Sequence, residues 1–280
     1  MCTLSVIPLL EGSGGRPNGG GRDPLVRSSG FRVAMNRDEL LTRPVAGPPG
    51  EHEVSGGVRA AWPRDEPSGG SWIAANEFGA VAAILNVNDS SSDDDGTAPR
   101  SRGLLLPPLM AHSSAVEMVE AVREEELSDY RPFRIVCVDG EVIAEGRWDG
   151  RTYDLSGRPL QAFCRVSSGL GDRYVEPRLD LWSRMLSQRG TDREVQNEFH
   201  AHRWSDRPHV SVLMDRPDAR TVSTTYATVL PDRVEMRYRD DDGMTMPLVL
   251  ERAPETSDAL AGGWTGPGPD RILGRIGAAG

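Results

Sequence analysis

Short apolar runs separated by turn residues constrain the fold of this chain more than any other feature of the sequence. The clearest case is FRIVCVDGEVIAEGRW (133–148), where Asp139-Gly140, the strongest short-range hairpin signal, separates two apolar runs. Similar runs predict strands over 3–9, 31–35, 71–76, 79–87, 161–167, 209–214, 220–230, 233–239 and 246–252. Because most neighbouring runs are joined by short turns, we expect an α+β fold with largely antiparallel pairing. The pattern leaves open whether the strands form one sheet or two stacked sheets.

Two helices are predicted between these strands. Ser114 and Glu117 form a capping box in front of apolar residues at helical spacing, which predicts a helix over 115–127. A second helix is expected at about 176–189, because Gly190 is a typical helix end.

The chain is long enough for one large domain, which we place at residues 1–252. The Gly-rich stretch 11–30 has no apolar period and predicts a flexible inserted loop. Residues 253–280 are dominated by Gly, Pro and Ala, and we expect a disordered tail there.

Charge and residue usage exclude several classes of function. The net charge of -10 argues against a nucleic-acid partner, and the absence of Lys among the 32 basic residues excludes Schiff-base, P-loop and Ser-Lys chemistry. Three Cys cannot form a disulfide framework, so a reducing compartment fits best. No apolar run reaches 18 residues and no signal peptide is recognisable. We therefore expect a cytoplasmic protein, without membrane insertion, that acts on or binds a small molecule.

Cys2 stands directly behind the initiator Met and is small enough for methionine aminopeptidases to expose it as the first residue. A terminal Cys carries a thiol and an α-amine, whose ordinary pKa values are about 8.5 and about 7.7–8.0. The amine can then act as general base for its own thiol without a His. The alternative is an ordinary buried Cys at the start of a strand.

Four polar residues, Asn36 to Glu39, follow directly on the apolar strand FRVAM. Strand ends are positions where a rigid scaffold presents catalytic side chains, although a solvated junction between strand and turn would look the same.

Four motifs in sequence resemble the NRDE family, also called the transport and Golgi organisation protein 2 family. They are MCTLSVIP, VAMNRDE with Pro44 shortly after it, GGSWIAANEFGAVAAILN and SRGLL (101–105). The match is dense over 1–105, apart from the loop 11–30, and partial beyond. The resemblance implies an N-terminal-nucleophile (Ntn) hydrolase-like fold, a four-layer αββα sandwich of two stacked antiparallel sheets.

The nearest chemistry in that superfamily is that of conjugated bile acid hydrolases and penicillin V acylases, which also begin Met-Cys-Thr. The resemblance implies that Cys2 is the nucleophile, that Arg37 lies near the thiolate, that Asp38 holds the α-amine and that Asn86 supplies an amide to an oxyanion hole. Elementary chemistry agrees, since a guanidinium and a terminal ammonium should lower the thiol pKa. The acylases space Arg and Asp differently from the adjacent pair in this chain.

Further candidates for substrate binding are Asn36, Asp172 and Arg220. Asp172 stands where the family usually has Asn, so it offers no amide donor. Val222 replaces an Arg of the family, and Arg220, two residues earlier on the same expected strand face, could substitute for it.

The sequence thus predicts an amidohydrolase with Cys2 as nucleophile, acting on a linear, non-peptide amide bond of an unknown small molecule. The alternative is a non-catalytic small-molecule binding or trafficking protein, with haem as one ligand, because eukaryotic members of the family are associated with Golgi organisation and haem mobilisation. We expect no resident cofactor and no metal. The residues His200, His202 and His209 lack matching carboxylates or thiolates, and Arg203 would repel a cation.

Overall fold

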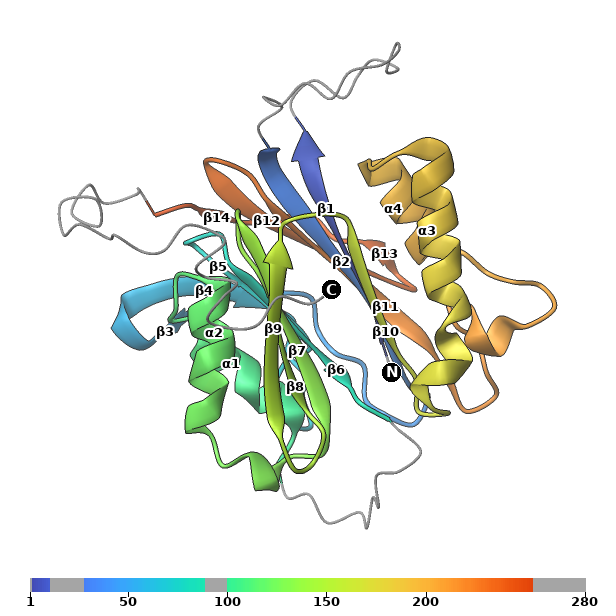
Figure 1. Cartoon of the computed structure of the whole chain (residues 1–280), viewed down its shortest axis with the longest axis horizontal. Coiled ribbons are helices and arrows are strands. Elements are labelled where there is room, and N and C mark those ends of the chain that lie inside the picture. Colours follow the sequence, from blue (N-terminus) through green and yellow to red (C-terminus); the bar gives the residue numbers. More distant parts are fainter. Residues whose placement is uncertain (1, 11–27, 89–99, 254–280) are drawn as a thin grey trace.

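The computed structural model describes residues 2–10, 28–88 and 100–253. These residues form two antiparallel sheets stacked face to face, with helices on each outer face (Figure 1). The arrangement confirms the predicted α+β, αββα sandwich and answers the question that the strand pattern left open. Within the described residues, no helix combines the length and apolar character needed to cross a membrane.

The first sheet carries the N-terminal strand one position in from its edge. Its strands, in spatial order, are β10 (Phe163–Ser167), β1 (Cys2–Leu10), β2 (Ser28–Leu40), β11 (Ala219–Val229) and β12 (Arg233–Asp240), and β12 also pairs with β13 (Gly243–Met244) and β14 (Leu248–Glu251). Cys2 lies opposite Arg37 on one side and opposite Ser167 on the other. The first residue of β1 is therefore flanked by strands on both sides.

The second sheet follows the order of the sequence. Its strands are β3 (Gly50–Val54), β4 (Val58–Trp62), β5 (Ile73–Asn76), β6 (Val81–Asn86), β7 (Phe133–Val138), β8 (Val142–Trp148) and β9 (Tyr153–Pro159). The predicted hairpin is present as β7 and β8, with Asp139-Gly140 between them. Asp139 accepts hydrogen bonds from the backbone N–H groups of Glu141 and Val142, which fixes the turn.

Two helical layers cover the outer faces. The helices α1 (Leu106–Leu109) and α2 (Ala115–Ala121) lie against the second sheet, and α3 (Pro177–Arg189) and α4 (Arg193–His200) lie against the first (Figure 1). The capping box of Ser114 and Glu117 is formed, but α2 ends earlier than predicted, in a 3-10 turn. Gly190 ends α3 with a φ of 81°, a conformation that glycine adopts without strain.

Apolar side chains alternate along each strand, which divides the core into three layers. Between the sheets, Leu4 and Met35 pack with Ile73 and Val136, all almost fully buried. The opposite face of β1 presents Ile7 to the α3–α4 layer. Other side chains of the second sheet pack beneath α1 and α2. Odd and even positions of β1 and β2 therefore face different layers.

Some predicted boundaries are wrong. The range 209–214 is not a strand, because Pro208–Val210 forms a 3-10 turn and the apolar residues that follow are buried without strand pairing. Strands β3, β4, β9 and β13 and helices α1 and α4 were not predicted. Residues 28–30 of the predicted loop 11–30 belong to β2, and the rest of that loop lies outside the described residues, as does the predicted tail from 254 onward.

Candidate functional site

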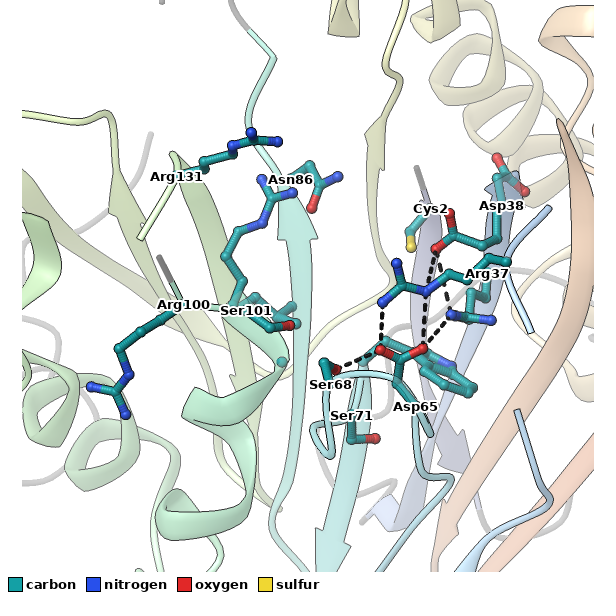
Figure 2. A pocket seen from close by; sticks show the side chains of 16 residues that line it. Cys2, Arg37, Asp38, Asp65, Ser68, Ser71, Asn86, Arg100, Ser101 and Arg131 are labelled. Atoms are coloured by element: carbon teal, nitrogen blue, oxygen red, sulfur yellow. Dashed lines mark hydrogen bonds and ion pairs between the residues drawn. The ribbon is translucent and has the colours of Figure 1, made fainter. Parts of the chain in front are cut away.

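A cavity of about 450 Å³ opens beside the first residue of β1. Its walls come from both sheets and from the segment that precedes α1 (Figure 2). The lining side chains are mostly polar or charged: Cys2, Arg37, Asp38, Glu39, Arg43, Asp65, Ser68, Ser71, Trp72, Ile84, Asn86, Arg100, Ser101, Arg102, Gly103 and Arg131. The four predicted catalytic residues Cys2, Arg37, Asp38 and Asn86 are all among them. The volume suits a small organic molecule.

The Cys2 thiol is almost fully enclosed, with 8% of the residue exposed. Its backbone N–H donates a hydrogen bond to the Ser167 hydroxyl, at 3.2 Å between nitrogen and Oγ. Ser167 is itself buried, at the end of β10. The backbone nitrogen that would become the α-amine after loss of Met1 thus has a fixed partner.

Burial raises the pKa of the Cys2 thiol above its usual value. The terminal ammonium lowers this pKa, the Asp38 carboxylate raises it, and Arg37 together with a hydrogen bond from the Asp38 backbone lowers it. The sequence led us to expect a lowered pKa. With Met1 in place the pKa is instead raised, because the cost of placing a thiolate in a dry environment exceeds the help of the nearby cations. The lowered pKa of the processed chain, whose ammonium lies on Cys2 itself, stays a prediction.

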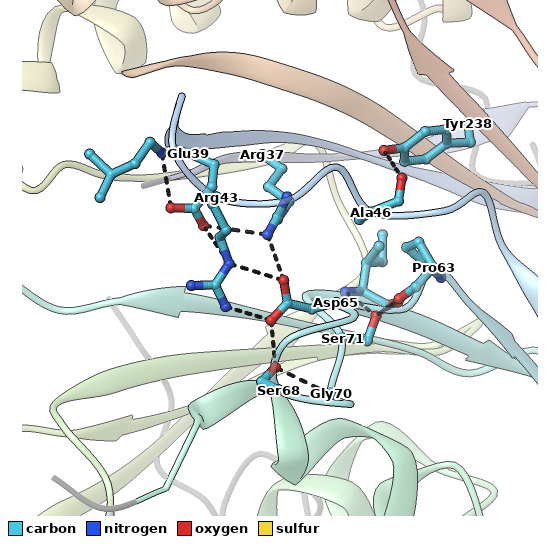
Figure 3. A network of polar contacts seen from close by, with 12 residues as sticks. Arg37, Glu39, Arg43, Ala46, Pro63, Asp65, Ser68, Gly70, Ser71 and Tyr238 are labelled. Atoms are coloured by element: carbon cyan, nitrogen blue, oxygen red, sulfur yellow. Dashed lines mark hydrogen bonds and ion pairs between the residues drawn. The ribbon is translucent and has the colours of Figure 1, made fainter. Parts of the chain in front are cut away.

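Arg37 is held in place from three directions, and Figure 3 shows two of them, the contacts with Asp65 and Glu39. Its guanidinium donates to Asp65 Oδ1 at 2.9 Å and to Glu39 Oε2 at 3.4 Å, and it lies 4.5 Å from the centre of the Trp72 ring. Asp65 also accepts hydrogen bonds from Arg43. Although burial alone would raise the pKa of Asp65, hydrogen bonds from Arg43 and Ser68 hold it below the usual value. The Asp65 carboxylate, with its lowered pKa, fixes the Arg37 guanidinium beside the cavity.

Alternation along β2 divides the Asn36–Glu39 segment between two faces. The side chains of Arg37 and Glu39 lie on the cavity side. The Asp38 carboxylate instead accepts hydrogen bonds from Arg178 of α3, at 3.2 Å, and from Thr221 of β11, at 2.6 Å. Asp38 therefore contributes to the cavity lining while its carboxylate is held from the helical layer.

Asn86 ends β6 and lines the wall that faces Cys2 (Figure 2). Its side chain is half-buried, and its amide makes no hydrogen bond within the described part of the chain. An amide in this position can donate to a bound carbonyl oxygen.

The structure places the three predicted substrate-binding residues outside the cavity lining. Asn36 is fully buried beneath α4, where its amide donates to the carbonyl groups of His200 and Val212. Asp172 accepts a hydrogen bond from the Ser168 backbone, in the turn before α3. Arg220 is exposed and forms an ion pair with Asp241.

Two of these departures, those of Asn36 and Arg220, have a physical reason. Asn36 points to the helices because it follows the opposite alternation to Arg37. The register between β11 and β2 shifts between Thr221 and Ser223. Arg220 and Val222 are two residues apart, but because of this shift they do not lie on the same face of the strand.

Close contact between two glycines explains two of the sequence motifs. A Cβ on Gly70 would lie 2.4 Å from the Gly103 carbonyl carbon, and one on Gly103 would lie 2.6 Å from the Ser71 carbonyl oxygen. The Ser71 N–H donates to the Gly103 carbonyl at 3.0 Å. GGSW and SRGLL thus meet backbone to backbone and close one wall of the cavity, which any larger residue would prevent.

Sequence reasoning missed Arg43, Asp65, Ser167, Arg102 and Arg131. These residues come from loops and strand ends that are distant in sequence, and nothing in their local pattern distinguishes them from solvated positions. Local signals were present for two of them, since Arg102 lies in the family motif SRGLL and Ser167 begins the stretch SSGLG, which resembles another segment of the family.

His200, weighed as a metal ligand, is a buried core residue. It contacts Ser5 Oγ at 2.7 Å and Asn36 Oδ1 at 2.9 Å, and burial lowers its pKa to about 3. The described residues contain no group of three or more His, Cys, Asp or Glu arranged to hold a metal ion.

Comparison with solved structures supports the fold. The chain is similar to the Caenorhabditis elegans N-acylethanolamine-hydrolyzing acid amidase ortholog, with a TM-score of 0.52 and 11% identity over 80% of this chain and 91% of that one. It is also similar to the C2A mutant of conjugated bile acid hydrolase from Clostridium perfringens, with a TM-score of 0.49 and 11% identity over 90% and 92% of the two chains. At this identity the first likeness shows the fold alone.

Comparison with sequences gives a family match over the central segment of the chain. No curated protein matches the chain. The family model described as "Transport and Golgi organisation 2" matches residues 28–161. This match confirms the predicted resemblance to the Transport and Golgi organisation 2 family, here carried on an Ntn-hydrolase-type sandwich.

Proposed function

We propose that this protein is an amidohydrolase in which Cys2, freed by removal of Met1, cleaves a linear, non-peptide amide of a small molecule. The observation that carries the proposal is one shared cavity, in which the Cys2 thiol lies beside Arg37 and faces Asn86. The fold, shared with the acid amidase ortholog, is consistent with this chemistry.

The reaction begins when the free α-amine of Cys2 takes the thiol proton and the thiolate attacks the amide carbon. The negative charge that develops on the carbonyl oxygen receives a hydrogen bond from the Asn86 amide. The ammonium then returns the proton to the departing nitrogen, which leaves as an amine. Water hydrolyses the remaining thioester by the same route, with the amine again as base, and restores the thiol.

Two neighbours prepare the amine for this role. Ser167 accepts a hydrogen bond from the Cys2 nitrogen and orients it. Asp38 lies near enough to act on Cys2 electrostatically. Its negative charge destabilises the Cys2 thiolate but stabilises the ammonium that forms when the amine takes the proton. Arg37 has the opposite effect and stabilises the thiolate. The paired charges thus support proton transfer from sulfur to nitrogen.

The test is acyl trapping on the intact protein. The wild-type chain is incubated with a panel of activated amides and β-lactams and its mass is measured, with Cys2→Ala as the negative variant and Cys164→Ala as the matched control. We expect acyl adducts on wild type and Cys164→Ala and none on Cys2→Ala. Adducts that survive the loss of Cys2 would contradict the assignment.

One observation favours a second candidate, a non-catalytic binding protein. Burial raises the pKa of the Cys2 thiol, and a protein that only holds a ligand needs no reactive thiolate. For haem, a thiolate-ligated complex would give a characteristic Soret band on titration of the purified protein, and Cys2→Ala would abolish it.

A further inference from the structure

We infer that the cavity selects a hydrophilic amide rich in oxygen atoms, and that Arg43, Asn86 and Ser101 donate hydrogen bonds to those oxygens. An amide with a long acyl chain is the ligand that this cavity rejects. The inference deepens the proposed function and rests on it only for the bond that is cleaved, because binding depends on the lining alone.

The lining presents almost no apolar surface to a ligand. Its largest apolar side chains, Trp72 and Ile84, are only 5% and 7% exposed. The Arg37 guanidinium lies over the Trp72 ring, 4.5 Å from its centre, and covers that face of the ring. A methylene group that enters an apolar pocket raises affinity by about fourfold, and it does so by contact with apolar walls. Lengthening an acyl chain therefore gains little in this cavity.

Charged side chains beside Cys2 form a balanced cluster. Asp65 pairs with two guanidinium groups, those of Arg37 and Arg43. Glu39 lies 3.4 Å and 3.6 Å from the same two groups, so two positive and two negative charges balance (Figure 3). Arg43 donates to Asp65 through Nε at 3.0 Å and through Nη2 at 2.5 Å, and this paired contact fixes its guanidinium. The cluster offers a ligand hydrogen-bond donors without excess charge.

Three groups of the lining retain hydrogen-bonding capacity. Arg43 uses Nε and Nη2 on Asp65, and its Nη1, turned away from Asp65, has no partner within the described ranges (Figure 3). The Asn86 amide and the Ser101 hydroxyl likewise make no hydrogen bond to the part of the chain that the structure describes. Asn86 and Ser101 lie across the cavity from Cys2 (Figure 2), whereas Arg43 lies on the Cys2 side. A ligand between them meets donors from two directions.

These groups favour oxygen atoms over apolar atoms. Guanidinium and amide N–H groups donate hydrogen bonds, and a hydroxyl can donate or accept. An acyl chain in contact with them would displace water without replacing its hydrogen bonds, and a donor left unpaired in an enclosed site is costly. Carbonyl and hydroxyl oxygens restore those bonds. The ligand that fits is therefore an amide with several oxygen atoms beyond its scissile carbonyl.

The experiment measures binding by ligand-observed NMR titration into Cys2→Ala, which lacks the nucleophile and leaves each probe intact. N-acetylglucosamine and N-cyclohexylacetamide both carry an acetamide on a six-membered ring, and only the first has hydroxyl groups. N-acetylethanolamine and N-propylacetamide form a second, flexible pair of the same kind. We expect N-acetylglucosamine to bind at least about tenfold more tightly than N-cyclohexylacetamide, through two or more additional hydrogen bonds.

A chain-length series tests the rejection of acyl chains. N-octanoylethanolamine has six more methylene groups than N-acetylethanolamine, and an apolar pocket would bind it more than about a thousandfold more tightly. In this cavity the two affinities should differ by less than about fivefold, because the added methylene groups find no apolar wall.

Variants in the Cys2→Ala background assign the preference to its residues. Ser101→Ala and Arg43→Lys should each weaken N-acetylglucosamine binding by about fivefold and leave N-cyclohexylacetamide binding unchanged. Asn86→Leu, of nearly equal size, should weaken the first probe and strengthen the second. Ser128→Ala, an exposed serine outside the lining, is the matched control for Ser101→Ala and should change neither. Circular dichroism confirms that each variant is folded.

The inference is overturned if the apolar member of both pairs binds as tightly as its hydrophilic partner, or if affinity rises steeply with acyl-chain length. Absence of binding by every hydrophilic probe, or a preference that none of the lining variants alters, also overturns it. Failure of the proposed function is recognised separately. A hydrophilic preference without acyl trapping on wild type keeps the binding site and removes the hydrolase, whereas acyl trapping with a preference for the octanoyl amide keeps the hydrolase and removes this inference.

Discussion

Replacing Asp38 with Asn should destabilise the whole fold, because it removes the counter-charge of a buried guanidinium. The side chains of Arg178 and Asp38 are 1% and 0% exposed, and the two groups are 3.2 Å apart. Arg178 also donates to Thr3 Oγ1 at 2.7 Å and to the Val210 carbonyl at 3.1 Å. The substitution would leave these neutral contacts in place, but it would remove the charge and replace one of the two accepting oxygens of Asp38 with an amide NH2 group.

Breaking a buried ion pair on one side costs about 3–5 kcal/mol. For a domain of this size, each kcal/mol lowers Tm by about 2–4 °C, so Asp38→Asn should melt roughly 10 °C below wild type. Thermal and urea unfolding followed by circular dichroism measure the effect. The exposed pair of Asp232 and Arg233 is the matched control, and Asp232→Asn should change stability by less than about 1 kcal/mol.

A double-mutant cycle identifies the cause. Arg178→Met alone leaves a buried carboxylate, and Asp38→Asn combined with Arg178→Met leaves neither charge, so the double variant should lose less stability than the two single losses added. If Asp38→Asn is as stable as wild type, or the two losses simply add, the pair does not hold α3 to the sheet as we argue.

Three further predictions concern the amine, the cavity wall and the response to acid. Ser167→Ala removes the partner of the Cys2 nitrogen and should slow acyl trapping about tenfold; an unchanged rate would remove Ser167 from the mechanism. Gly70→Ala forces a Cβ onto the backbone of Gly103 and should cost at least about 2 kcal/mol in urea unfolding, whereas Gly140→Ala, which meets no atom within 4 Å, should be nearly neutral. The folded-state pKa of His200, about 3, lies below its unfolded value. The contribution of His200 to the free energy of unfolding is therefore complete above about pH 6.5 and is lost as pH falls, by about 2 kcal/mol at pH 5. In urea unfolding, His200→Gln should lose less free energy of unfolding between pH 7 and pH 5 than wild type does. An equal loss in both proteins would mean that other groups cause the acid sensitivity.

Strands with a strong apolar pattern could be predicted from the sequence, and edge strands could not. The hairpin of β7 and β8 carries both alternation and an Asp-Gly turn, so its local signals agree. Strand β9 pairs only with β8 at the edge of the sheet, and only one of its seven residues is buried, so it lacks the apolar pattern of an inner strand. Edge position is a tertiary property, which the residues of β9 do not encode locally.

The helix α4 was missed although it carries a readable signal. Asp192 caps its first turn by accepting a hydrogen bond from the Val195 N–H, at 2.8 Å. The helix is short, and its apolar residues Val195 and Phe199 are too few to stand out. Tertiary burial of Phe199 against the first sheet stabilises it instead.

The site was predictable where a family motif included the residue, as it does for Cys2, Arg37 and Asn86. Cys2 and Arg37 lie opposite each other in neighbouring strands, and the motifs indicated both. Asp65 reaches Arg37 from the loop between β4 and β5, 28 residues away, and no local pattern marks such an encounter. Alternation along β2 could have assigned Asn36 and Asp38 to the helical face, had the strand been predicted through Leu40.

The most direct test of the central claim is the pH dependence of Cys2 alkylation by iodoacetamide in two forms of the protein. One form has lost Met1, as N-terminal sequencing verifies, and the other retains it after expression with methionine aminopeptidase inhibited. Burial raises the pKa of Cys164 to about 12 and also raises that of Cys137, so both serve as internal references.

We predict that near neutral pH Cys2 of the processed form reacts faster than both references and faster than Cys2 of the form that retains Met1. Arg37→Met should slow it at neutral pH, with recovery as pH rises, because only the charge that stabilises the thiolate is lost. If Cys2 reacts equally slowly in both forms at every pH and is insensitive to Arg37→Met, Cys2 is not an activated nucleophile and the hydrolase assignment is wrong.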